Sequence, residues 1–379
     1  WIGEIPEGWE TINPKALFAQ RKDRASKGER QLTSSQQYGI LYQDEYMELT
    51  GSKVVTVEKD FDILKHVETG DFVISMRSFQ GGLEYSTKSG AISSAYVMLV
   101  PNLELVYPRF YRWLLKSSVY IDALQRTTNM VRDGQAMRYS NFAQVRLFTL
   151  PLDEQKSRAD FLDLECSSID KILFKTRSSI EEYKKLKQAV ITQAVTEGTP
   201  AMFSSPHSVK LKYLISIVSG EAIRNEQLSD FGESPVYGGG EIIGFCSQYN
   251  TSEGSLIIGR VGARCGCVTH TTCKSWATDN ALIVLPTCNA KYMYYVIGHC
   301  QLNNLNTSNA QPLITSTKIK NVVVPYFSDA MQQQEIADYL DAKCAKIDGL
   351  IAKKEQLVKE LESYKKSLIY EVVTGKREV

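Results

Sequence analysis

Two long stretches of the chain repeat a seam residue at alternating spacings of three and four positions. This alternation is the a/d pattern of a coiled-coil helix, in which a narrow apolar stripe faces a partner helix. The first seam is Leu162, Cys166, Ile169, Leu173, Thr176, Ile180, Tyr183, Lys187 and Val190. The second seam is Leu340, Cys344, Ile347, Ile351, Lys354, Val358, Leu361, Lys365 and Leu368. The pattern predicts two helices of about 40 to 45 residues, or roughly 65 Å at ~1.5 Å per residue.

The two seams belong to one internal repeat with an ungapped offset of 178 residues, measured from Cys166 to Cys344. FLDLECSSIDKI at 161–172 returns as YLDAKCAKIDGL at 339–350. Polar residues interrupt both seams at the same two places, and such interruptions restrict register and partner choice. Neither helix can bury its stripe alone, so we expect them to pair as an antiparallel coiled coil. The alternative is that they are two unrelated amphipathic helices of a bundle.

The rest of the chain forms two stretches with the pattern of short strands and turns. Segments 71–101 and 254–286 are each rich in Val, Ile and Ser, broken by glycine turns, and closed by a proline. We therefore expect a mixed α/β fold with two similar globular domains related by a pseudo-twofold axis. The predicted domains are a first globular domain over 1–150, a central helical region over 151–198, a second globular domain over 199–325 with a linker at 199–208, and a C-terminal helical region over 326–379.

Length, charge and composition exclude only a few classes of protein. A length of 379 residues exceeds the size at which one core usually keeps growing, which also favours several domains. The chain has 44 basic and 43 acidic residues, so any nucleic-acid role has to rest on local clusters. No apolar run is long enough to predict a membrane span. Eight cysteines without a regular framework predict reduced thiols and a cytoplasmic location, and the start at Trp1 predicts a trimmed or partial N-terminus.

Basic and amide side chains gather in a few loops that could contact DNA. The segment RKDRASKGER at 21–30 has five basic residues, and Arg77 and Arg260 occupy corresponding places after apolar strands. Arginine and glutamine suit bidentate contacts to guanine and adenine, while glycine permits close backbone approach. The candidate DNA-binding residues are Lys22, Arg24, Lys27, Arg77, Gln80, Gly81, Arg132, Arg138, Arg260, Arg264, Lys274, Asn309 and Gln311. For each of them the alternative is a solvated surface group or an internal ion pair.

Motifs of the main enzyme classes are missing from the sequence. It has no methyl-donor glycine loop with an Asn/Asp-Pro-Pro-aromatic motif, no Walker phosphate loop, no His-Glu-x-x-His pair and no Gly-x-Ser-x-Gly elbow. We therefore predict a chain without catalytic residues that directs partner enzymes.

One cluster, RCGCVTHTTC, raises the alternative of a zinc site. Cys265, Cys267, His270 and Cys273 are the four candidate ligands. Their spacing is more compressed than in usual structural zinc sites, and strand alternation would separate them onto both faces. We favour buried reduced cysteine and predict no metal site.

Several segments resemble the specificity (S) subunits of Type I restriction-modification systems. The resemblance covers essentially the whole chain and is carried by IGEIPEGWE at 2–10, TLPLDEQ at 149–155, VVPYFSDAMQQQEIADYLD at 323–341 and SLIYEVVTGK at 367–376. The second copy departs from the pattern, because Pro325 is separated from the following Gln pair by four more residues than Pro151 is from Glu154-Gln155.

The resemblance implies a DNA-recognition subunit of a multisubunit methyltransferase and endonuclease. Each globular domain would read half of a split target in double-stranded DNA, and the helices would set the spacer. Two methyltransferase subunits would dock on the helices and use S-adenosylmethionine, and restriction subunits with motor and nuclease activity would join them. This chain would bind no cofactor of its own. The alternative is a coiled-coil scaffold that binds protein rather than DNA.

Overall fold

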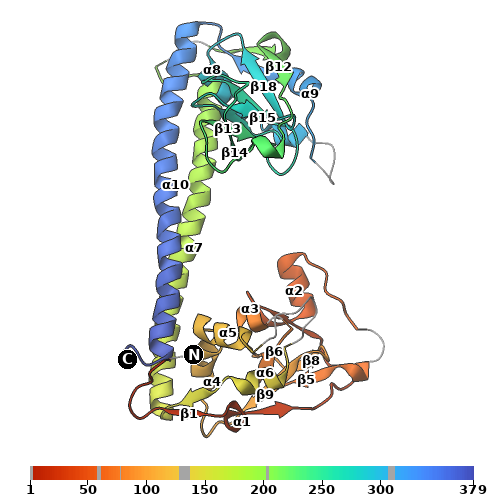
Figure 1. The fold of residues 1–379 in the computed structure, drawn as a ribbon, viewed down its shortest axis with the longest axis vertical. Helices are drawn as coiled ribbons and strands as arrows, with labels where there is room; N and C mark the ends of the chain where they lie inside the picture. Colours follow the sequence, from red (N-terminus) through yellow and green to blue (C-terminus); the bar gives the residue numbers. More distant parts are fainter. Residues whose placement is uncertain (1–2, 58–60, 77, 128–136, 202–204, 306–311) are drawn as a thin grey trace. The chain divides into compact units, whose positions relative to one another are not determined.

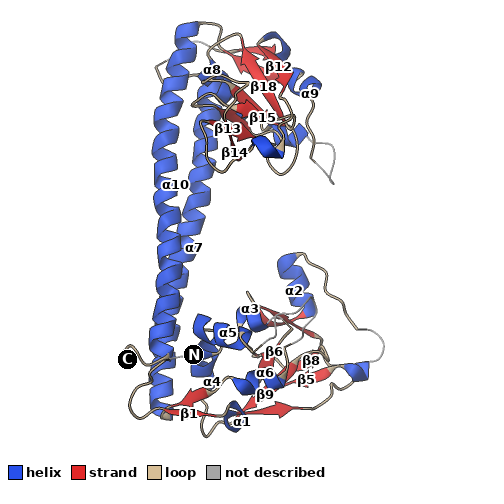
Figure 2. Ribbon diagram, viewed as in Figure 1, coloured by secondary structure: helices blue, strands red, loops and turns tan. Residues whose placement is uncertain are grey.

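The computed structural model describes residues 1–379 except 1–2, 58–60, 77, 128–136, 202–204 and 306–311 (Figure 1). The chain divides into two compact units. The first unit contains Trp1–Thr176 and Leu357–Val379, and the second contains Arg177–Gln356. No helix in the described residues is both long and apolar enough to cross a membrane. The predicted mixed α/β class is confirmed, since both units contain helices and antiparallel sheets (Figure 2).

A four-stranded antiparallel sheet forms the centre of the first unit. Its strands lie in the order β2-β9-β6-β7, with Phe18 of β2 opposite Pro101 of β9. Because side chains alternate across a strand, Phe72 and Ile74 of β6 join the main core while Val73 joins a smaller cluster on the opposite face. The strands are β2 (Phe18–Arg21), β9 (Val97–Pro101), β6 (Phe72–Ile74) and β7 (Glu84–Tyr85).

Shorter elements surround this sheet. Three strand pairs are β1 (Glu10–Ile12) with β10 (Leu147–Thr149), β3 (Leu32–Ser35) with β4 (Gly39–Tyr42), and β5 (Lys65–Val67) with β8 (Gly90–Ile92). The helices are α1 (Pro14–Leu17), α2 (Gln43–Thr50), η1 (Phe61–Ile63), α3 (Ser78–Gly81), α4 (Pro108–Leu114), α5 (Ser118–Gln125) and α6 (Tyr139–Gln144). Residues 78–81 of the segment RSFQGG form the single helical turn α3, and the amide of Ser75 donates to the Ser78 hydroxyl at its start.

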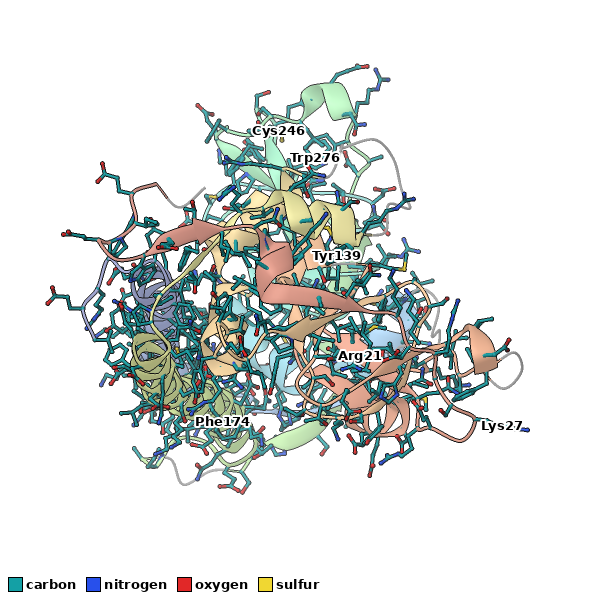
Figure 3. All side chains as sticks on the ribbon, turned by 90° about the horizontal axis from the view of Figure 1, so that it is seen from below. Arg21, Lys27, Tyr139, Phe174, Cys246 and Trp276 are labelled. Carbon is teal, nitrogen blue, oxygen red and sulfur yellow. The ribbon has the colours of Figure 1, made fainter. Side chains whose placement is uncertain are left out.

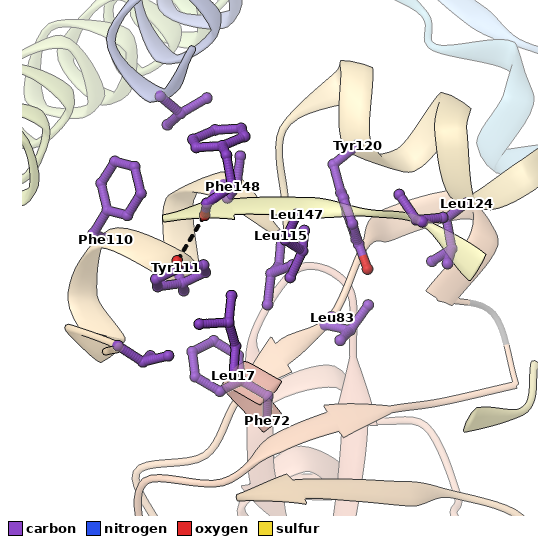
Figure 4. Packing of buried hydrophobic residues seen from close by; sticks show 14 of the residues in the cluster. Leu17, Phe72, Leu83, Phe110, Tyr111, Leu115, Tyr120, Leu124, Leu147 and Phe148 are labelled. Atoms are coloured by element: carbon purple, nitrogen blue, oxygen red, sulfur yellow. Dashed lines mark hydrogen bonds between the residues drawn. The ribbon is translucent and has the colours of Figure 1, made fainter. Parts of the chain in front are cut away.

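Aromatic and leucine side chains pack together in the main core of the first unit (Figure 4). Phe18 makes edge-on contacts with Phe72, Tyr111 and Phe142 at centroid distances of 5.4, 5.5 and 5.8 Å. The buried Tyr111 hydroxyl donates to the Phe148 carbonyl at 2.8 Å, so its polar atom is satisfied.

The second unit contains a sheet with the same strand order. Its order is β12-β18-β15-β16, and all neighbouring strands are antiparallel. These strands are β12 (Ile215–Ser219), β18 (Ala281–Pro286), β15 (Leu256–Gly259) and β16 (Val268–His270). A second sheet joins β14 (Ile242–Cys246), β13 (Ser234–Tyr237) and β17 (Trp276–Ala277), and β11 (His207–Lys210) pairs with β19 (Val323–Tyr326). The helices are η2 (Leu211–Tyr213), η3 (Asn225–Gln227), α8 (Ala290–His299), η4 (Leu302–Leu305) and α9 (Ser316–Lys320).

Strand β11 begins inside the segment 199–208 that the sequence predicts as a linker. His207 and Ser208 lie opposite Tyr326 and Pro325 of β19, so pairing with a distant strand overrides the local Pro and Ser content. The predicted domain boundaries otherwise stay a prediction.

The two long helices are α7 (Leu152–Glu197) and α10 (Ala330–Val373), with 46 and 44 residues. In the first unit, Leu162, Ile169 and Leu173 of α7 are buried in the same core as Leu368 of α10, with Val358 and Leu361 packed against it. In the second unit, Leu340 and Ile347 of α10 and Ile180 of α7 are buried, while Tyr183, Val190 and Ile351 are half-buried. The predicted seam residues are thus on the covered side of each helix.

An ion pair joins the two helices in each unit. Lys365 contacts Asp170 at 2.6 Å in the first unit, and Lys187 contacts Asp348 at 2.7 Å in the second. Lys187 and Lys365 are equivalent in the repeat, as are Asp170 and Asp348. Lys187 lies seventeen residues after Asp170, and Asp348 lies seventeen residues before Lys365, so both pairs fit one antiparallel register.

Candidate nucleic-acid interface

The basic segment 21–30 is largely tied down by contacts within the first unit. Arg21 forms a bidentate ion pair with Asp71, at 2.6 and 3.0 Å, and its hydrogen bonds to that carboxylate raise its pKa above the ordinary value. Arg24 donates to the Ile63 carbonyl at 2.9 Å, and Arg30 contacts Asp44 at 2.7 Å. These contacts favour the internal alternative for part of the segment.

Lys22 and Lys27 remain as exposed cations of this segment. Within the part of the chain that the structure describes, neither has an ion-pair partner. Lys27 points away from the first unit at its outer edge, whereas Arg21 lies over the unit (Figure 3). Lys22 and Lys27 are therefore suited to sequence-independent phosphate contacts.

A histidine between two carboxylates anchors the far end of the same segment. The His66 Nδ1 lies 2.9 Å from Glu29 and the Nε2 lies 3.2 Å from Glu68, while the His66 amide donates to the Asp23 carbonyl. Partial burial lowers the pKa of His66, but the hydrogen bonds to both glutamates outweigh it, so the pKa is raised. Hydrogen bonds from the Ser89 hydroxyl and from His66 lower the pKa of Glu68 to about 2.

We expect this anchor to weaken in alkaline solution. A group with a raised folded-state pKa contributes stability that is fully present below its unfolded pKa of about 6.5 and is lost as the pH rises through the folded value. The urea midpoint of the first unit should therefore fall between about pH 6 and pH 9 by more in the native chain than in His66→Gln. His207→Gln, in the second unit, is the control. Identical slopes for the native chain and His66→Gln would contradict this role of His66.

The candidates around α3 and α6 are only partly described. Arg77 and Arg132 lie outside the described residues, as do Asn309 and Gln311 of the second unit. Gln80 is exposed on α3, and Arg138 is exposed before α6, where its amide donates to the Asn141 side chain at 3.1 Å. These two positions stay predictions.

The glycines beside Gln80 serve contacts inside the first unit. Gly82 has a φ of +77°, and a Cβ there would lie 2.3 Å from the Leu115 carbonyl oxygen. At Gly81 a Cβ would lie 2.7 Å from the Gln36 side chain. At both positions, the space left by the missing side chain is occupied by another part of the first unit.

In the second unit, Arg260 follows β15 as predicted and is half-buried. Its carbonyl accepts from the Ile314 amide at 3.0 Å and from the Cys265 thiol at 3.1 Å, which fixes its backbone. Arg264 pairs with Glu241 at 3.1 Å, and both side chains are exposed. A Cβ at Gly259 would lie 2.4 Å from the Gly239 carbonyl oxygen, so the loops carrying Arg260 and Glu241 meet through bare backbone.

Lys274 lies against an aromatic ring that the sequence analysis did not single out. Its Nζ lies 4.4 Å from the ring centroid of Tyr249 and donates to the Tyr249 hydroxyl at 3.2 Å. The first unit has a similar arrangement around Tyr42. The Arg30 Cζ lies 3.5 Å from the Tyr42 ring centroid, and the Lys88 Nζ lies 4.5 Å from it. These pairs join residues far apart in sequence, so no local signal identifies them.

The four residues proposed as alternative zinc ligands do not form a common site. Cys265 is buried against the Arg260 carbonyl, Cys267 is exposed, and His270 packs edge-on against Tyr294 at 6.2 Å. Among the described residues, which include all four, no group of three His, Cys, Asp or Glu side chains could hold a metal ion. All eight cysteines are free thiols.

A family model described as the Type I restriction modification DNA specificity domain matches residues 207–360. The match covers the second globular part and most of α10, which holds the second seam of the repeat. The resemblance to specificity subunits drawn from the sequence is thereby confirmed.

Individual specificity subunits are also similar to this chain. The Type I restriction enzyme EcoprrI specificity subunit from Escherichia coli is 28% identical over 109 residues, which span 28% of this chain and 27% of that relative's length. A chain solved in work on complex assembly and conformational transition of the type I R-M system has a TM-score of 0.74 at 14% identity, covering 99% of this chain and 100% of its own. The HsdS subunit from Thermoanaerobacter tengcongensis has a TM-score of 0.53 at 14% identity, covering 99% and 98%. At such identity these structures are similar in fold alone.

Proposed function

We propose that this chain is the non-catalytic DNA-specificity subunit of a Type I restriction-modification complex. The observation that carries the proposal is the recurrence of one sheet order, β2-β9-β6-β7 and β12-β18-β15-β16, ahead of each long helix. Two reading heads of one fold, each on its own helix, suit a DNA target that is split into two half-sites. We use "first head" for residues 10–149 and "second head" for residues 207–326.

Each head reads one half-site through its own loops. Lys22 and Lys27 of the first head and Lys274 of the second supply positive charge for phosphate contacts, which position the head without reading sequence. Gln80, Arg138 and Arg260 are described residues whose side-chain types suit contacts to base edges. Because the chain's net charge is only +1, affinity rests on these local groups and on the partner subunits.

The long helices act as an antiparallel coiled coil with pseudo-twofold symmetry. The matched pairs Lys187–Asp348 and Lys365–Asp170 support one continuous register along it. A rigid spacer converts helix length into a fixed gap between half-sites. Exposed apolar side chains on α7, such as Phe174 at 75% exposure, offer docking area for two methyltransferase subunits.

The remaining chemistry belongs to the partners. The methyltransferase subunits use S-adenosylmethionine and act on an adenine flipped out of the stack in each half-site. Restriction subunits then complete the cleaving complex in the cytoplasm. This chain holds no cofactor.

A coiled-coil scaffold that binds only protein is the second candidate. The exposed apolar side chains of α7 and the balanced charge favour it. It differs from the specificity subunit in one testable respect, since a scaffold leaves the modified DNA sequence unaffected by the identity of its globular parts.

A chain with two copies of the first head distinguishes the two functions. Residues 14–146 would replace residues 211–322, which keeps the closing strands β11 and β19 in place. We expect the modified motif to become an inverted repeat of the first half-site with an unchanged gap, because pseudo-twofold heads read opposite strands. Sequencing of modified adenines reports the motif. A motif that keeps the bases of both original half-sites would contradict the proposed reading heads.

A further inference from the structure

Two buried glutamines stand at equivalent positions in the first turns of the long helices. Gln155 of α7 and Gln333 of α10 are separated by the 178-residue offset of the repeat and are 0% and 2% exposed. The four extra residues after Pro325 lie before α10 begins at Ala330. Gln333 therefore keeps the same place in its helix as Gln155 has in α7. A buried amide has to be hydrogen-bonded, so the partners of these side chains are structurally required.

Both glutamines bind the start of a helix in their own head. The Gln155 Oε1 accepts from the amide of Tyr107, the N-cap of α4, at 2.7 Å. The Gln333 Oε1 accepts in the same way from the amide of Asn289, the N-cap of α8, at 3.1 Å. Each Nε2 also donates to the chain that enters the long helix, to the Leu150 carbonyl at 2.9 Å and to the Phe327 carbonyl at 2.6 Å.

Two aspartates repeat this arrangement eight residues further along the long helices. Asp163 of α7 accepts from Arg109 at 2.8 Å, from Arg112 at 2.9 Å and from the Trp113 Nε1 at 2.7 Å, and all three donors lie on α4. Charge-assisted hydrogen bonds of this kind are the stronger ones in proteins.

Asp341 of α10 is the equivalent of Asp163 in the repeat. It accepts from the Tyr295 hydroxyl at 2.8 Å and forms an ion pair with Lys291, and both partners lie on α8. The donor side chains differ between the two heads, while the acceptor carboxylate and its place on the helix are the same.

Two points of attachment fix the direction of each head relative to its long helix, whereas a single point would let the head rotate. The Gln and Asp of each pair lie about 12 Å apart along their helix, at ~1.5 Å per residue. They hold the start and a later turn of the same head helix, so the head cannot pivot on its long helix. A pivot of about 10° would move a loop some 20 Å away by about 3.5 Å, which is one base-pair step of DNA.

We propose that Gln155, Asp163, Gln333 and Asp341 are positioning residues that hold each head at a fixed angle to its long helix and so restrict the complex to one gap length. The proposal rests on the proposed function of the chain. None of these four residues contacts DNA, and other residues determine which bases are read.

The test uses the complex of this chain with its methyltransferase subunits. Three duplexes carry the same half-sites with the native gap, one base pair fewer and one more. We expect Asp163→Ala and Asp341→Ala to raise methylation of the altered gaps, relative to the native gap, by about tenfold. Lys175→Ala and Lys353→Ala are matched controls, because these residues occupy equivalent exposed positions on α7 and α10 and are expected to leave the ratio unchanged.

Each other outcome has a defined meaning. An unchanged gap ratio, or an equal loss on all three duplexes, would overturn the proposal, since a merely structural residue gives such results. If an alanine variant does not assemble, Asp163→Asn and Asp341→Asn, which keep the volume and one acceptor oxygen, decide the question by the same ratio. Failure of the asparagine variants to assemble would also overturn it. A native complex without any split motif would overturn the proposed function and this inference together.

Discussion

Removing residues 176–182 from α7 together with residues 353–359 from α10 is expected to abolish modification of the native split motif. The two segments lie opposite one another in the register fixed by Lys187–Asp348 and Lys365–Asp170, so their joint removal leaves both ion pairs intact. Each helix loses seven residues, or about 10 Å, which corresponds to about three base pairs of DNA.

The size of the effect follows from the rigidity of a paired helix. Seven residues are close to two whole turns, so the heads keep nearly the same rotation about the spacer while their separation shortens. A displacement of this size is expected to lower methylation of native-gap sites by at least about a hundredfold. Any motif that is still modified should show a shorter gap and unchanged bases in each half-site.

A duplex library with gaps from the native length down to four base pairs shorter would measure this effect, using sequencing of modified adenines. A length-neutral variant that replaces only the exposed residues of the same two segments is the control, and it should keep the native gap. Retention of the native gap by the shortened chain would show that the helices do not set the spacing.

The second large effect is expected from Arg158→Met in the first unit. Arg158 is 6% exposed, and its guanidinium donates to the carbonyls of Val372 and Arg377, both at 2.9 Å. It also pairs with Glu154 at 2.7 Å and lies 5.0 Å from the ring centroid of Trp9. Removal leaves two carbonyls near the end of α10 without this donor, which we expect to cost about 2–4 kcal/mol of unfolding free energy.

Urea unfolding of the full chain, followed by tryptophan fluorescence, would measure the loss in the first unit. Lys156→Met is the matched control, because it removes the same charge from an exposed position two residues earlier and should change the free energy by less than about 0.5 kcal/mol. Equal destabilisation by the two variants would show that the buried contacts of Arg158 do not hold the end of α10 in place.

The long helices could be predicted from the sequence because their signal is local and repeated. Leu162 and Leu340 share a seam spacing that no strand can satisfy, and the ungapped offset identifies the second copy from the first. The sheet orders could not be predicted, since β2 pairs with β9 across some eighty residues of chain. Pairing at this distance depends on the whole core and leaves little trace in the spacing of nearby residues.

The candidate interface shows a sharper limit of sequence reasoning. A basic segment identifies positive charge, but whether a guanidinium is available depends on partners elsewhere in the chain. Arg24 is occupied by the Ile63 carbonyl and Arg264 by Glu241, whereas Lys22 and Lys27 of the same kind of loop are exposed. The role of Gln155 was equally hidden, because a buried glutamine looks like any surface glutamine until its partner, Tyr107, is placed.

The most direct test of the account is a genome-wide map of modified adenines in cells that express this chain with its methyltransferase partner, compared with cells that lack the chain. A split motif with one fixed gap should appear only when the chain is present. Absence of new modification, although the partner is active and bound to the chain, would contradict the reading of DNA by the two heads and would leave the protein-binding scaffold as the better account.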